Sequence, residues 1–434
     1  MILVDTALRE LEAAGTPIRV GIVGAGFMAQ GVANQIVNSV PGMRLVAVAG
    51  RRLERAAHVV GYAGGEPEEV RSVGTLAAAV RRGRTAITTD PLLLCRSEAV
   101  DLIVEATGAV EYATHVVLEA FANGTDVVLM NAELDATIGP LLHVRAREAG
   151  VIMSACDGDE PGVQLNLVRW VRGLGLVPRI IGNVKGLQDP YRNPTTQRGF
   201  AERWGQNPSM VTSFADGTKI SCEQSIVANA TGFRVLQRGM SRGREFRELP
   251  ERLPELYLPI LDEIRAVGGI IDYTVGTIGT KVYVLAEHAD PKQRHYLELY
   301  KMGPGPLYAF WVPYHLVHFE VPNAIARVRI FRDELAPPLG GPVVEVCAVA
   351  KRDLGRGETL DGYGSYMTYG EAANSGEMRA ERYLPEGLVE GCVLRRDVAR
   401  DEVLRYDDVE LPRGRVADRL RSEQYELFSG SSPI

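Results

Sequence analysis

The chain has 434 residues, enough for two to four domains at roughly 100–200 residues each. Its hydrophobic fraction of 46% and charged fraction of 24% are typical of a globular protein and exclude a disordered or fibrous chain. A net charge of −7 argues against a nucleic-acid-binding or membrane-binding surface. Five scattered cysteines without a CxxC pair argue against a disulfide framework, and the charged N-terminal segment, which lacks a signal peptide, predicts a cytoplasmic protein.

The N-terminal part of the chain alternates strand and helix patterns. A helix is predicted over residues 3–14, and five short apolar runs after it are typical of buried strands with helices between them. The predicted strands are Ile18–Val23, Leu45–Ala49, Leu102–Glu105, Val127–Met130 and Val151–Ser154, and the predicted helices are Val32–Val40, Tyr112–Asn123 and Gly139–Ala149. Residues 51–100 show a less obvious pattern. Because alternating strands and helices form a parallel, doubly wound sheet, we expect a Rossmann domain over residues 1–160.

Dense Gly and Pro punctuation marks a second region, residues 161–341. Its pattern predicts a helix over Val163–Val171 and strands over Arg179–Val184, Ile270–Thr277, Lys281–Ala286 and Ala324–Phe331. Mixed elements of this kind predict an α+β domain. We assign substrate binding and oligomerisation to it, and we expect a homodimer or a larger homo-oligomer.

The third region, residues 342–434, contains a short internal repeat. Arg352-Asp353-Leu354 begins a segment that recurs as Arg396-Asp397-Val398, and both segments continue to a Glu and a Leu at the same spacing. Two copies are too few for a solenoid, so they predict two similar turns in a small β-rich domain. A strand is predicted over Val343–Ala350 and a final helix near Asp418–Leu427. The whole chain is therefore predicted to be an α/β protein of three domains.

A glycine-rich turn follows the first predicted strand. Gly24-Ala25-Gly26-Phe27-Met28-Ala29 has the GxGxxA form of a phosphate-binding turn. Its first Gly allows the tight turn, its second lets the backbone approach a pyrophosphate, and the small last residue lets helix and strand pack. Because the motif stands between a strand and a helix and precedes a second strand, it predicts a dinucleotide site. A glycine turn without a ligand is the alternative.

The end of the second predicted strand indicates which dinucleotide binds. NAD sites usually place an Asp or Glu there, bonded to the ribose 2′-hydroxyl. This chain has Arg51 and Arg52 instead, and two guanidinium groups can pair with a 2′-phosphate. We therefore expect NADP, with ordinary solvated surface arginines as the alternative.

Two further turns are expected to line the cofactor crevice, because they follow predicted parallel strands at the ligand edge of the sheet. One follows Glu105 and the other follows Met130. The cofactor-binding residues predicted in these turns are Ala106, Thr107, Gly108, Asn131 and Glu133. Plain βα turns use the same residue types and remain the alternative.

At these positions the chain resembles homoserine dehydrogenases and their relatives. The resemblance rests on residues 20–26, 101–108, 127–133 and 158–161. The chain departs from that family where it has Asn131-Ala132 in place of Asn-Lys, and again over residues 182–197 in place of a Gly-Thr-Asn segment. The resemblance implies a Rossmann domain followed by a catalytic domain, and the departures argue against homoserine as the substrate.

A closer resemblance extends over nearly the whole chain. Its segments are similar to the 1-deoxy-D-xylulose 5-phosphate reductoisomerase-like enzymes of isoprenoid biosynthesis, which combine the same scaffold with a C-terminal SAF domain. The segments are Lys185–Gln197, Trp204–Asn207, Ser213–Gly232 and Pro313–Pro322, and the repeated Arg-Asp segments resemble the SAF domain. This resemblance implies NADPH-dependent isomerisation and reduction of 1-deoxy-D-xylulose 5-phosphate to 2-C-methyl-D-erythritol 4-phosphate.

The segment from Asp216 to Glu223 supplies most of the catalytic candidates. If it is helical, Lys219 and Glu223 share a face, and Asp216 stands where an N-cap acid belongs. A similarly placed Lys near an Asp serves proton transfer in homoserine dehydrogenases, so the resemblance implies Lys219 as proton donor, oriented by Asp216 and Glu223. Lys185, in a Gly-flanked turn at a predicted strand end, is the fourth candidate. A capped surface helix with a salt bridge is the alternative.

Polar side chains after Lys185 form a dense donor cluster that suits a substrate phosphate or polyol. The substrate-binding residues predicted there are Arg192, Asn193, Thr195, Thr196 and Gln197, with a polar surface loop as the alternative. His315, in the aromatic segment 308–318, is predicted to close over a pocket, with core packing as the alternative. Asp157, Asp159 and Glu160 could hold Mg²⁺ or Mn²⁺ or cap a helix, so a metal stays open.

Together these patterns predict an enzyme, an NADPH-dependent oxidoreductase acting on a small carbonyl compound that is phosphorylated or polyhydroxylated. The favoured reaction is the one that the reductoisomerase resemblance implies. A simple dehydrogenase, similar to homoserine dehydrogenase, on another hydroxy acid, semialdehyde or sugar derivative is the alternative. A dinucleotide-sensing binding protein is the third reading. The chain has neither a GxSxG nor an HExxH motif, so nucleophilic serine and zincin chemistry have no support.

Overall fold

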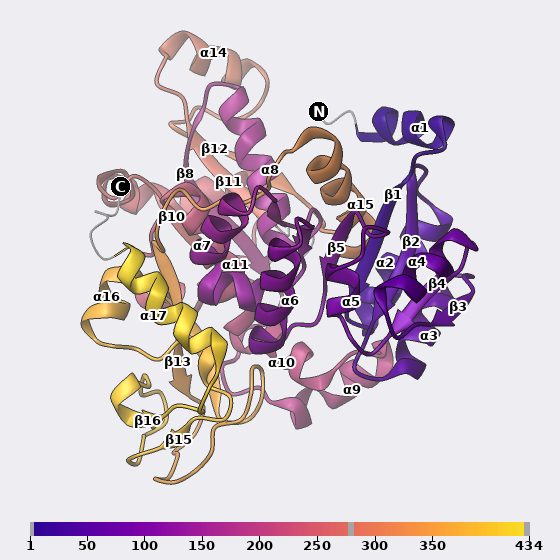
Figure 1. Ribbon diagram of the computed structural model, residues 1–434. Coiled ribbons are helices and arrows are strands. Elements are labelled where there is room, and N and C mark those ends of the chain that lie inside the picture. The colour runs from indigo at the N-terminus through magenta and orange to yellow at the C-terminus, as the bar shows by residue number, and fades with distance from the viewer. Residues whose placement is uncertain (1–3, 277–281, 429–434) are drawn as a thin grey trace. The chain divides into compact units, whose positions relative to one another are not determined.

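The computed structural model describes residues 4–276 and 282–428, and the chain divides into two compact units. Unit 1 contains Met1–Asp159 and Leu316–Pro337, and unit 2 contains Glu160–His315 and Pro338–Ile434. Figure 1 shows the elements in chain order, from indigo at the N-terminus to yellow at the C-terminus. The predicted third region falls in unit 2, and the three-domain division itself stays a prediction.

Unit 1 is built on a parallel seven-stranded sheet in the order β3-β4-β2-β1-β5-β6-β7 (Figure 1). Strand β1 pairs with β2 on one side and with β5 on the other, so the strand order reverses at β1. Sheets of this kind bind ligands at the carboxyl ends of the strands beside the reversal. The strands are β1 Ile18–Val23, β2 Met43–Ala49, β3 Pro67–Glu69, β4 Thr85–Thr88, β5 Leu102–Glu105, β6 Asp126–Leu129 and β7 Met153–Ala155.

Helices cover this sheet and complete its apolar core. Ile22, Val104 and Val128 of the strands belong to one buried cluster with Val32 and Ile36 of α2. The helices of unit 1 are α1 Val4–Ala14, α2 Phe27–Asn38, α3 Leu53–Tyr62, α4 Val73–Arg81, α5 Leu92–Cys95, α6 Val110–Ala122, α7 Ala132–Glu148 and α15 Val317–Ala326. The predicted doubly wound Rossmann fold is confirmed.

Strands β3 and β4 lie in the region 51–100, where the sequence pattern is weakest. Strand β4 is buried along its whole length because it lies inside the sheet, between β2 and β3. Two of its residues are nevertheless threonines, and the Thr85 hydroxyl donates to the Leu45 carbonyl at 3.2 Å. A search for apolar runs therefore misses this strand, because two hydroxyl groups, both bonded to backbone groups, replace part of its apolar surface.

Unit 2 contains a five-stranded mixed sheet in the order β12-β11-β8-β10-β9. The central strand β8 is parallel to β10 and antiparallel to β11. The strands are β8 Val177–Lys185, β9 Arg244–Glu245, β10 Ile270–Val275, β11 Val282–Glu287 and β12 Leu307–Val312. The strands predicted over 179–184, 270–277 and 281–286 are confirmed for their described residues, and Thr277 and Lys281 lie outside the described residues.

Helices α8 and α11 pack beside this sheet and carry many buried polar side chains. The helices of unit 2 are α8 Glu160–Gly173, α9 Pro194–Trp204, α10 Pro208–Asp216, α11 Thr218–Thr231, α12 Leu253–Tyr257, α13 Leu261–Ala266, α14 Pro291–Leu299, α16 Ser375–Ala380 and α17 Val416–Phe428. Short 3₁₀ helices occupy Arg238–Arg242, Pro250–Arg252, Leu258–Ile260, Glu386–Leu388 and Tyr406–Asp408. Within the described residues, no helix combines the length and the apolarity that crossing a bilayer requires.

The two copies of the repeat pair with each other in the C-terminal part of unit 2. Leu354 and Val398 exchange backbone hydrogen bonds of 2.8 Å and 2.9 Å. Each repeat Asp accepts a backbone amide of the other copy, Asp397 at 2.8 Å and Asp353 at 2.9 Å. The repeat is therefore a self-complementary turn whose two copies hold each other, and the predicted pair of similar turns is confirmed.

Within each copy an arginine closes the turn. Arg352 bonds to Glu358 at 2.6 Å, and Arg396 bonds to Glu402 at 2.7 Å, so the Arg and Glu of the repeat form equivalent ion pairs. The strands around these turns are short. β13 Val344–Ala350 pairs with β14 Thr368–Asn374, and β15 Val393–Leu394 pairs with β16 Val409–Glu410, both antiparallel.

Residues 324–331 form a helix, so the strand predicted there is wrong. Helix α15 continues into a π-helical turn over Arg327–Phe331. The buried residues Val321, Ala324, Ile325 and Val328 recur at spacings of three and four, which is the helical period. The short apolar run alone is compatible with either period, and packing of α15 against α2 selects the helix.

We expect Asp353→Ala and Asp397→Ala to lower the free energy of unfolding by similar amounts, about 1 kcal/mol each, because each removes one acceptor of a backbone amide in equivalent turns. Urea unfolding of the full chain measures the change. Asp407→Ala is the control, because its ion pair with Arg382 is 62–70% exposed and contributes little. A large loss for one repeat Asp and none for the other would contradict the equivalence of the turns.

Candidate active site

The glycine-rich turn joins β1 to α2 in unit 1. Gly24 has φ +117°, and a Cβ there would meet the Ala106 carbonyl oxygen at 2.7 Å, so no larger residue fits. At Gly26, by contrast, a Cβ would have nothing within 4 Å, so the backbone is open to an approaching group. Phe27 and Met28 then begin α2, whose N-terminus has no side-chain cap. Free amide donors and open space suit a pyrophosphate, so the turn fits a dinucleotide.

The two arginines predicted to select NADP follow directly after β2. Gly50 is held against the glycine-rich turn, since a Cβ at Gly50 would meet the Ala25 Cβ at 2.7 Å. Arg51 and Arg52 are both exposed, and Arg52 lies 3.6 Å from Glu54 in a pair that is 61–71% exposed. Such an exposed pair is weak, so both guanidinium groups can turn toward a phosphate.

Two of the predicted crevice residues are tied to one buried carboxyl group, that of Glu105 at the end of β5. Glu105 accepts the Thr107 amide and hydroxyl, and the Asn131 side-chain amide at 3.0 Å. The Asn131 side-chain oxygen in turn caps α7 by accepting the Leu134 amide at 3.0 Å. Burial outweighs these hydrogen bonds and raises the pKa of Glu105 to about 7. Thr107 and Asn131 therefore set the shape of the crevice turns.

The remaining predicted crevice residues are placed differently. Ala106 and Gly108 are half-buried, and Glu133 is buried in the first turn of α7. Ala29 of the glycine-rich turn is also fully buried, as close packing of α2 on the sheet requires. Direct cofactor contact by these residues stays a prediction.

In unit 2, charged side chains from several elements meet around Lys185, at the end of β8. The Lys185 ammonium lies 2.7 Å and 2.9 Å from the two oxygens of Glu160 and 3.6 Å from Glu223. His315 Nε2 lies 3.3 Å from Glu160, and Asn183, on the same face of β8 as Lys185, donates to Glu160. The start of α8, the end of β8, α11 and the segment after β12 thus bring four titratable groups together. We refer to Glu160, Lys185, Glu223 and His315 as the Lys185 cluster.

The charges in the Lys185 cluster are balanced around Glu160. Burial alone would raise the pKa of Glu160, but the Lys185 ammonium, a hydrogen bond with Glu223 and His315 together outweigh burial and lower it to about 2. The Glu223 carboxyl group thus lies beside both Glu160 and Lys185. The Lys185 and His315 side chains are 14% and 26% exposed, whereas the two acids are nearly inaccessible. The Lys185 ammonium, which carries a proton, is therefore partly open to solvent, whereas the acids beside it are buried.

The other predicted catalytic residues lie partly in this cluster and partly elsewhere. Helix α11 contains both Lys219 and Glu223, each buried, as the predicted helix requires. Asp216 ends α10 instead, and its carboxylate pairs with Lys351 at 2.8 Å while accepting the Thr218 amide at 2.9 Å. The structure thus brings Lys185 and Glu223 together and directs Asp216 to a different cation. The catalytic roles of all four residues stay predictions.

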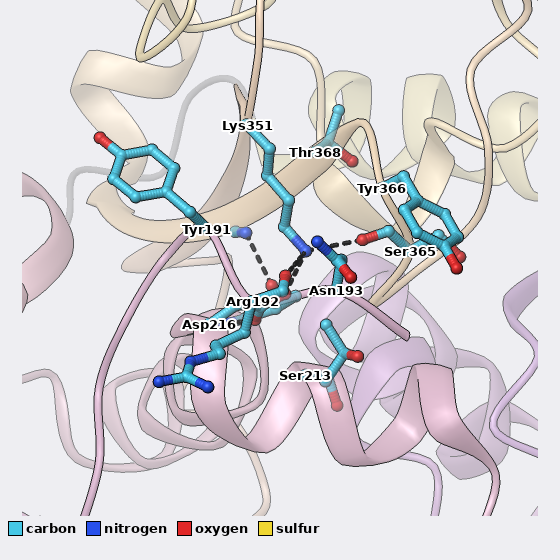
Figure 2. A network of polar contacts seen from close by, with 12 residues as sticks. Tyr191, Arg192, Asn193, Ser213, Asp216, Lys351, Ser365, Tyr366 and Thr368 are labelled. Carbon is cyan, nitrogen blue, oxygen red and sulfur yellow. Dashed lines mark hydrogen bonds and ion pairs between the residues drawn. The ribbon is translucent and has the colours of Figure 1, made fainter. Parts of the chain in front are cut away.

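Figure 2 shows the polar network around Lys351. Besides Asp216, its ammonium donates to the carbonyl oxygens of Arg192 at 2.9 Å and Ser365 at 2.7 Å, so all three donor positions are used. The Lys351 side chain is only 3% exposed. Burial raises the pKa of Asp216, and Lys351 offsets part of that effect. This ion pair ties the C-terminal part of unit 2 to α10 and to the loop before α9.

The predicted substrate-binding stretch forms the N-terminal cap of α9. The Asn193 side chain accepts the amides of Thr195 at 3.0 Å and Thr196 at 3.1 Å, and the Thr196 hydroxyl accepts the Asn193 amide at 3.0 Å. Arg192 is paired at 3.0 Å with the aspartate three residues before it, and Gln197 is half-buried. Most of the predicted phosphate donors thus have local partners. Their contact with a substrate phosphate stays a prediction.

Two of the acids considered for a metal have cationic partners instead. Asp157 is buried in unit 1, where it pairs with Arg327 at 2.9 Å, whereas Glu160 belongs to the Lys185 cluster of unit 2. Across residues 4–276 and 282–428, no group of three or more His, Cys, Asp or Glu side chains is placed to hold a metal ion. The residues described thus give no positive support to a divalent metal.

Sequence patterns do not identify Glu160 and Lys351 as the partners of Lys185 and Asp216. These partners lie 25 and 135 positions away along the chain, beyond the reach of helix or strand periodicity. One local signal does exist for the first pair. A Glu-Pro step opens the helix predicted near residue 163, and Asn183 and Lys185 alternate along a predicted strand, so both are expected to face the same side.

Glu105→Gln should change how stability depends on pH. The folded-state pKa of Glu105, about 7, lies above the ordinary pKa of a glutamate. Between these two pKa values the folded protein therefore binds one more proton than the unfolded chain. The unmodified protein therefore loses stability as the pH rises from the lower to the higher of these two pKa values. The glutamine side chain of the variant does not titrate. Relative to the variant, the free energy of unfolding of the unmodified protein should fall by about 2–3 kcal/mol between pH 4.5 and pH 7.5. Urea unfolding at several pH values measures this difference, and a constant difference would contradict the assignment.

Two protein families match adjoining parts of the chain. The family described as "Homoserine dehydrogenase, NAD binding domain" matches residues 24–154, which contain the glycine-rich turn and most of the unit 1 sheet. The family described as "Oxidoreductase DRL, catalytic domain" matches residues 158–321, which contain the whole Lys185 cluster. Neither match extends into residues 342–434, so the SAF resemblance stays a prediction.

Individual proteins are similar to the chain over different lengths. Homoserine dehydrogenase from Pseudomonas aeruginosa is 30% identical over 175 residues, 36% of this chain and 35% of that protein, so the chain spans about a third of the length of this curated relative. A probable dehydrogenase from Thermotoga maritima is 13% identical and covers 74% of this chain and 91% of its own, with a TM-score of 0.39. A putative myo-inositol dehydrogenase from Sinorhizobium meliloti is 12% identical and covers 74% and 92%, also with a TM-score of 0.39.

The two family matches show that the chain is an enzyme of the oxidoreductase class with a binding domain for NAD or NADP. They favour the dehydrogenase alternative over the reductoisomerase reaction, because the named relative is a homoserine dehydrogenase. They give no support to a dinucleotide sensor without catalytic activity. The chain thus contains a nucleotide-binding domain for NAD or NADP followed by an oxidoreductase catalytic domain.

Proposed function

We propose that the chain is an NADPH-dependent dehydrogenase that interconverts a hydroxyl and a carbonyl group on a small polar metabolite, with Lys185 transferring the proton. The observation that carries this proposal is the contact of Lys185 with both oxygens of Glu160, inside the matched oxidoreductase catalytic domain. An ammonium that a buried carboxylate holds in place, and that stays partly exposed, can donate its proton at a defined position.

The residues of unit 1 fit NADP at both of its phosphate groups. The open backbone at Gly26 and the uncapped start of α2 suit the pyrophosphate. Arg51 and Arg52, neither of them in a buried ion pair, suit the 2′-phosphate. When bound, the nicotinamide supplies or accepts the hydride.

The Lys185 cluster can supply and then replace the proton that carbonyl reduction needs. Lys185 donates a proton to the carbonyl oxygen, and the charged Glu160 keeps the ammonium oriented before that step. The resulting amine lies 3.6 Å from Glu223, and because the Lys185 side chain is 14% exposed, a proton from water can restore the ammonium. In the direction of alcohol oxidation, the same groups accept the proton.

The reductoisomerase reaction is a second candidate. The four segments between residues 185 and 322 that carry that resemblance fall almost entirely within residues 158–321, the range of the catalytic-domain match, whereas the repeated Arg-Asp segments lie outside it. A dehydrogenase leaves the carbon skeleton of its substrate unchanged, whereas a reductoisomerase rearranges it. Product structure therefore separates the two reactions.

Turnover with a panel of compounds tests the proposed function. The full chain is incubated with NADPH and with semialdehydes, 2-oxo acids and sugar phosphates, including 1-deoxy-D-xylulose 5-phosphate, while NADPH consumption is followed. Products are then identified by NMR. An alcohol with an unchanged skeleton supports the dehydrogenase, and a branched product supports the reductoisomerase. NADPH binding without consumption on any compound contradicts both.

Lys185→Met should lower kcat by roughly 10²–10⁴-fold and leave NADPH affinity unchanged, because it removes the proton donor and leaves the nucleotide residues intact. Steady-state kinetics and NADPH titration measure the two effects. Lys292→Met, at an exposed position of α14, is the matched control and should keep its kcat. Near-normal turnover by the Lys185 variant excludes it as donor, and if Lys219→Met abolishes turnover instead, the donor is Lys219.

Arg51→Glu combined with Arg52→Glu should weaken NADPH binding and spare NADH. The double change removes two partners of the 2′-phosphate and adds repulsion, whereas NADH has no phosphate at that position. Fluorescence titration with both nucleotides gives the ratio of their affinities. Equal losses for NADPH and NADH would show that these arginines do not select the cofactor.

A further inference from the structure

A cavity of about 760 Å³ lies in the C-terminal part of unit 2, apart from the Lys185 cluster. Its walls come from α16 and the chain after it, from the segment around β16, and from α17. All lining residues fall between 378 and 425, so none of them belongs to the Lys185 cluster. This volume lies within the roughly 300–1,000 Å³ that small-molecule sites span.

Four arginines line this cavity, and two of them have carboxylate partners. Arg421 pairs with Glu345, and both side chains are fully buried. Arg382 lies 3.2 Å from Asp407, but the two side chains are 62% and 70% exposed, so that pair is easily exchanged for another anion. Arg421 is therefore fixed by the fold, whereas Arg382 is available at the rim.

The other two arginines, Arg379 and Arg395, have no carboxylate partner within the described residues. The Arg379 guanidinium lies 5.6 Å from the ring centre of Tyr425, and its buried Nε has no hydrogen-bond partner among those residues. A buried donor without an acceptor is costly, so an incoming acceptor would be stabilised there. Arg395 is exposed at the edge of the same cavity.

We propose that this cavity binds a small organic anion, a phosphorylated or carboxylated metabolite, whose charged group contacts Arg379 and Arg395. Guanidinium groups recognise phosphate and carboxylate alike, through paired N–H bonds. Tyr406, Leu411 and Tyr425, each partly exposed, supply apolar surface for the rest of the ligand. Four lining arginines against Asp407 and Glu410 leave an excess of positive charge in a chain whose net charge is −7. An inorganic anion would leave most of the volume unfilled, so the ligand has an organic body.

Calorimetric titration of the full chain tests this site with glucose 6-phosphate, citrate and inorganic phosphate, and with glucose as the neutral probe. We expect glucose 6-phosphate or citrate to bind and glucose not to bind, and the better anion identifies phosphate or carboxylate as the recognised group. Arg379→Met with Arg395→Met should weaken this binding roughly 10-fold or more. Arg419→Met, an exposed arginine of α17 outside the cavity lining, is the matched control and should leave binding unchanged.

Ser422→Glu is a second variant. Ser422 is an exposed residue of α17 that lines the cavity, so packing tolerates a larger side chain there, and a carboxylate at this position repels an anion. This substitution should also weaken binding, while turnover stays at its original value in every variant, since none alters the Lys185 cluster. The proposal is overturned if neither organic anion binds at millimolar concentration. It is also overturned if the double variant Arg379→Met with Arg395→Met and the variant Ser422→Glu both bind the anion as tightly as the unmodified protein.

Discussion

Several buried cations in this protein are held against carboxylates, and these pairs organise much of unit 2. A buried ammonium or guanidinium without a counter-charge costs several kcal/mol, so an acid placed beside it removes a large cost. Lys185 meets Glu160 and Lys351 meets Asp216, in both cases through elements that are distant along the chain. Unit 1 follows the same rule, since Arg327, with its side chain 2% exposed, lies between Asp157 and Asp333.

Lys185 and Lys351 of unit 2 form similar ion pairs but differ in their other contacts and in their exposure. Lys351 uses all three donor positions on Asp216 and two backbone carbonyls, so no position is left for a ligand and the pair fastens the C-terminal part to α10. Lys185 keeps 14% of its side chain exposed, and Glu223 lies 3.6 Å from its ammonium. The number of acceptors and the access to solvent, rather than the pairing itself, are why we propose Lys185 and not Lys351 as the proton donor.

Against this background, arginines without a buried acid partner become informative. Arg51 and Arg52 stand exposed beside the glycine-rich turn, where a 2′-phosphate would supply the missing charge. Arg379 and Arg395 stand in the C-terminal cavity, where no described carboxylate neutralises them. In both places a guanidinium group without a buried acid partner lies next to open space, which is why we propose an external anion there.

The sequence by itself determined the features that depend on near neighbours. The GxGxxA turn, the strand–helix alternation of unit 1 and the paired Arg-Asp turns all follow from spacing and backbone geometry, so they could be predicted before the structure. The helix over residues 324–331 and the strand β4 could not be predicted in this way. A short apolar run is compatible with either the helix or the strand period, and the threonines of β4 interrupt the apolar pattern typical of a buried strand. Only the tertiary structure decided the composition of the candidate site. In the tertiary structure Glu160 lies beside Lys185, and Asp216 pairs with Lys351. Which acid contacts which buried cation depends on how elements that are distant along the chain pack, and the local sequence does not reveal that packing.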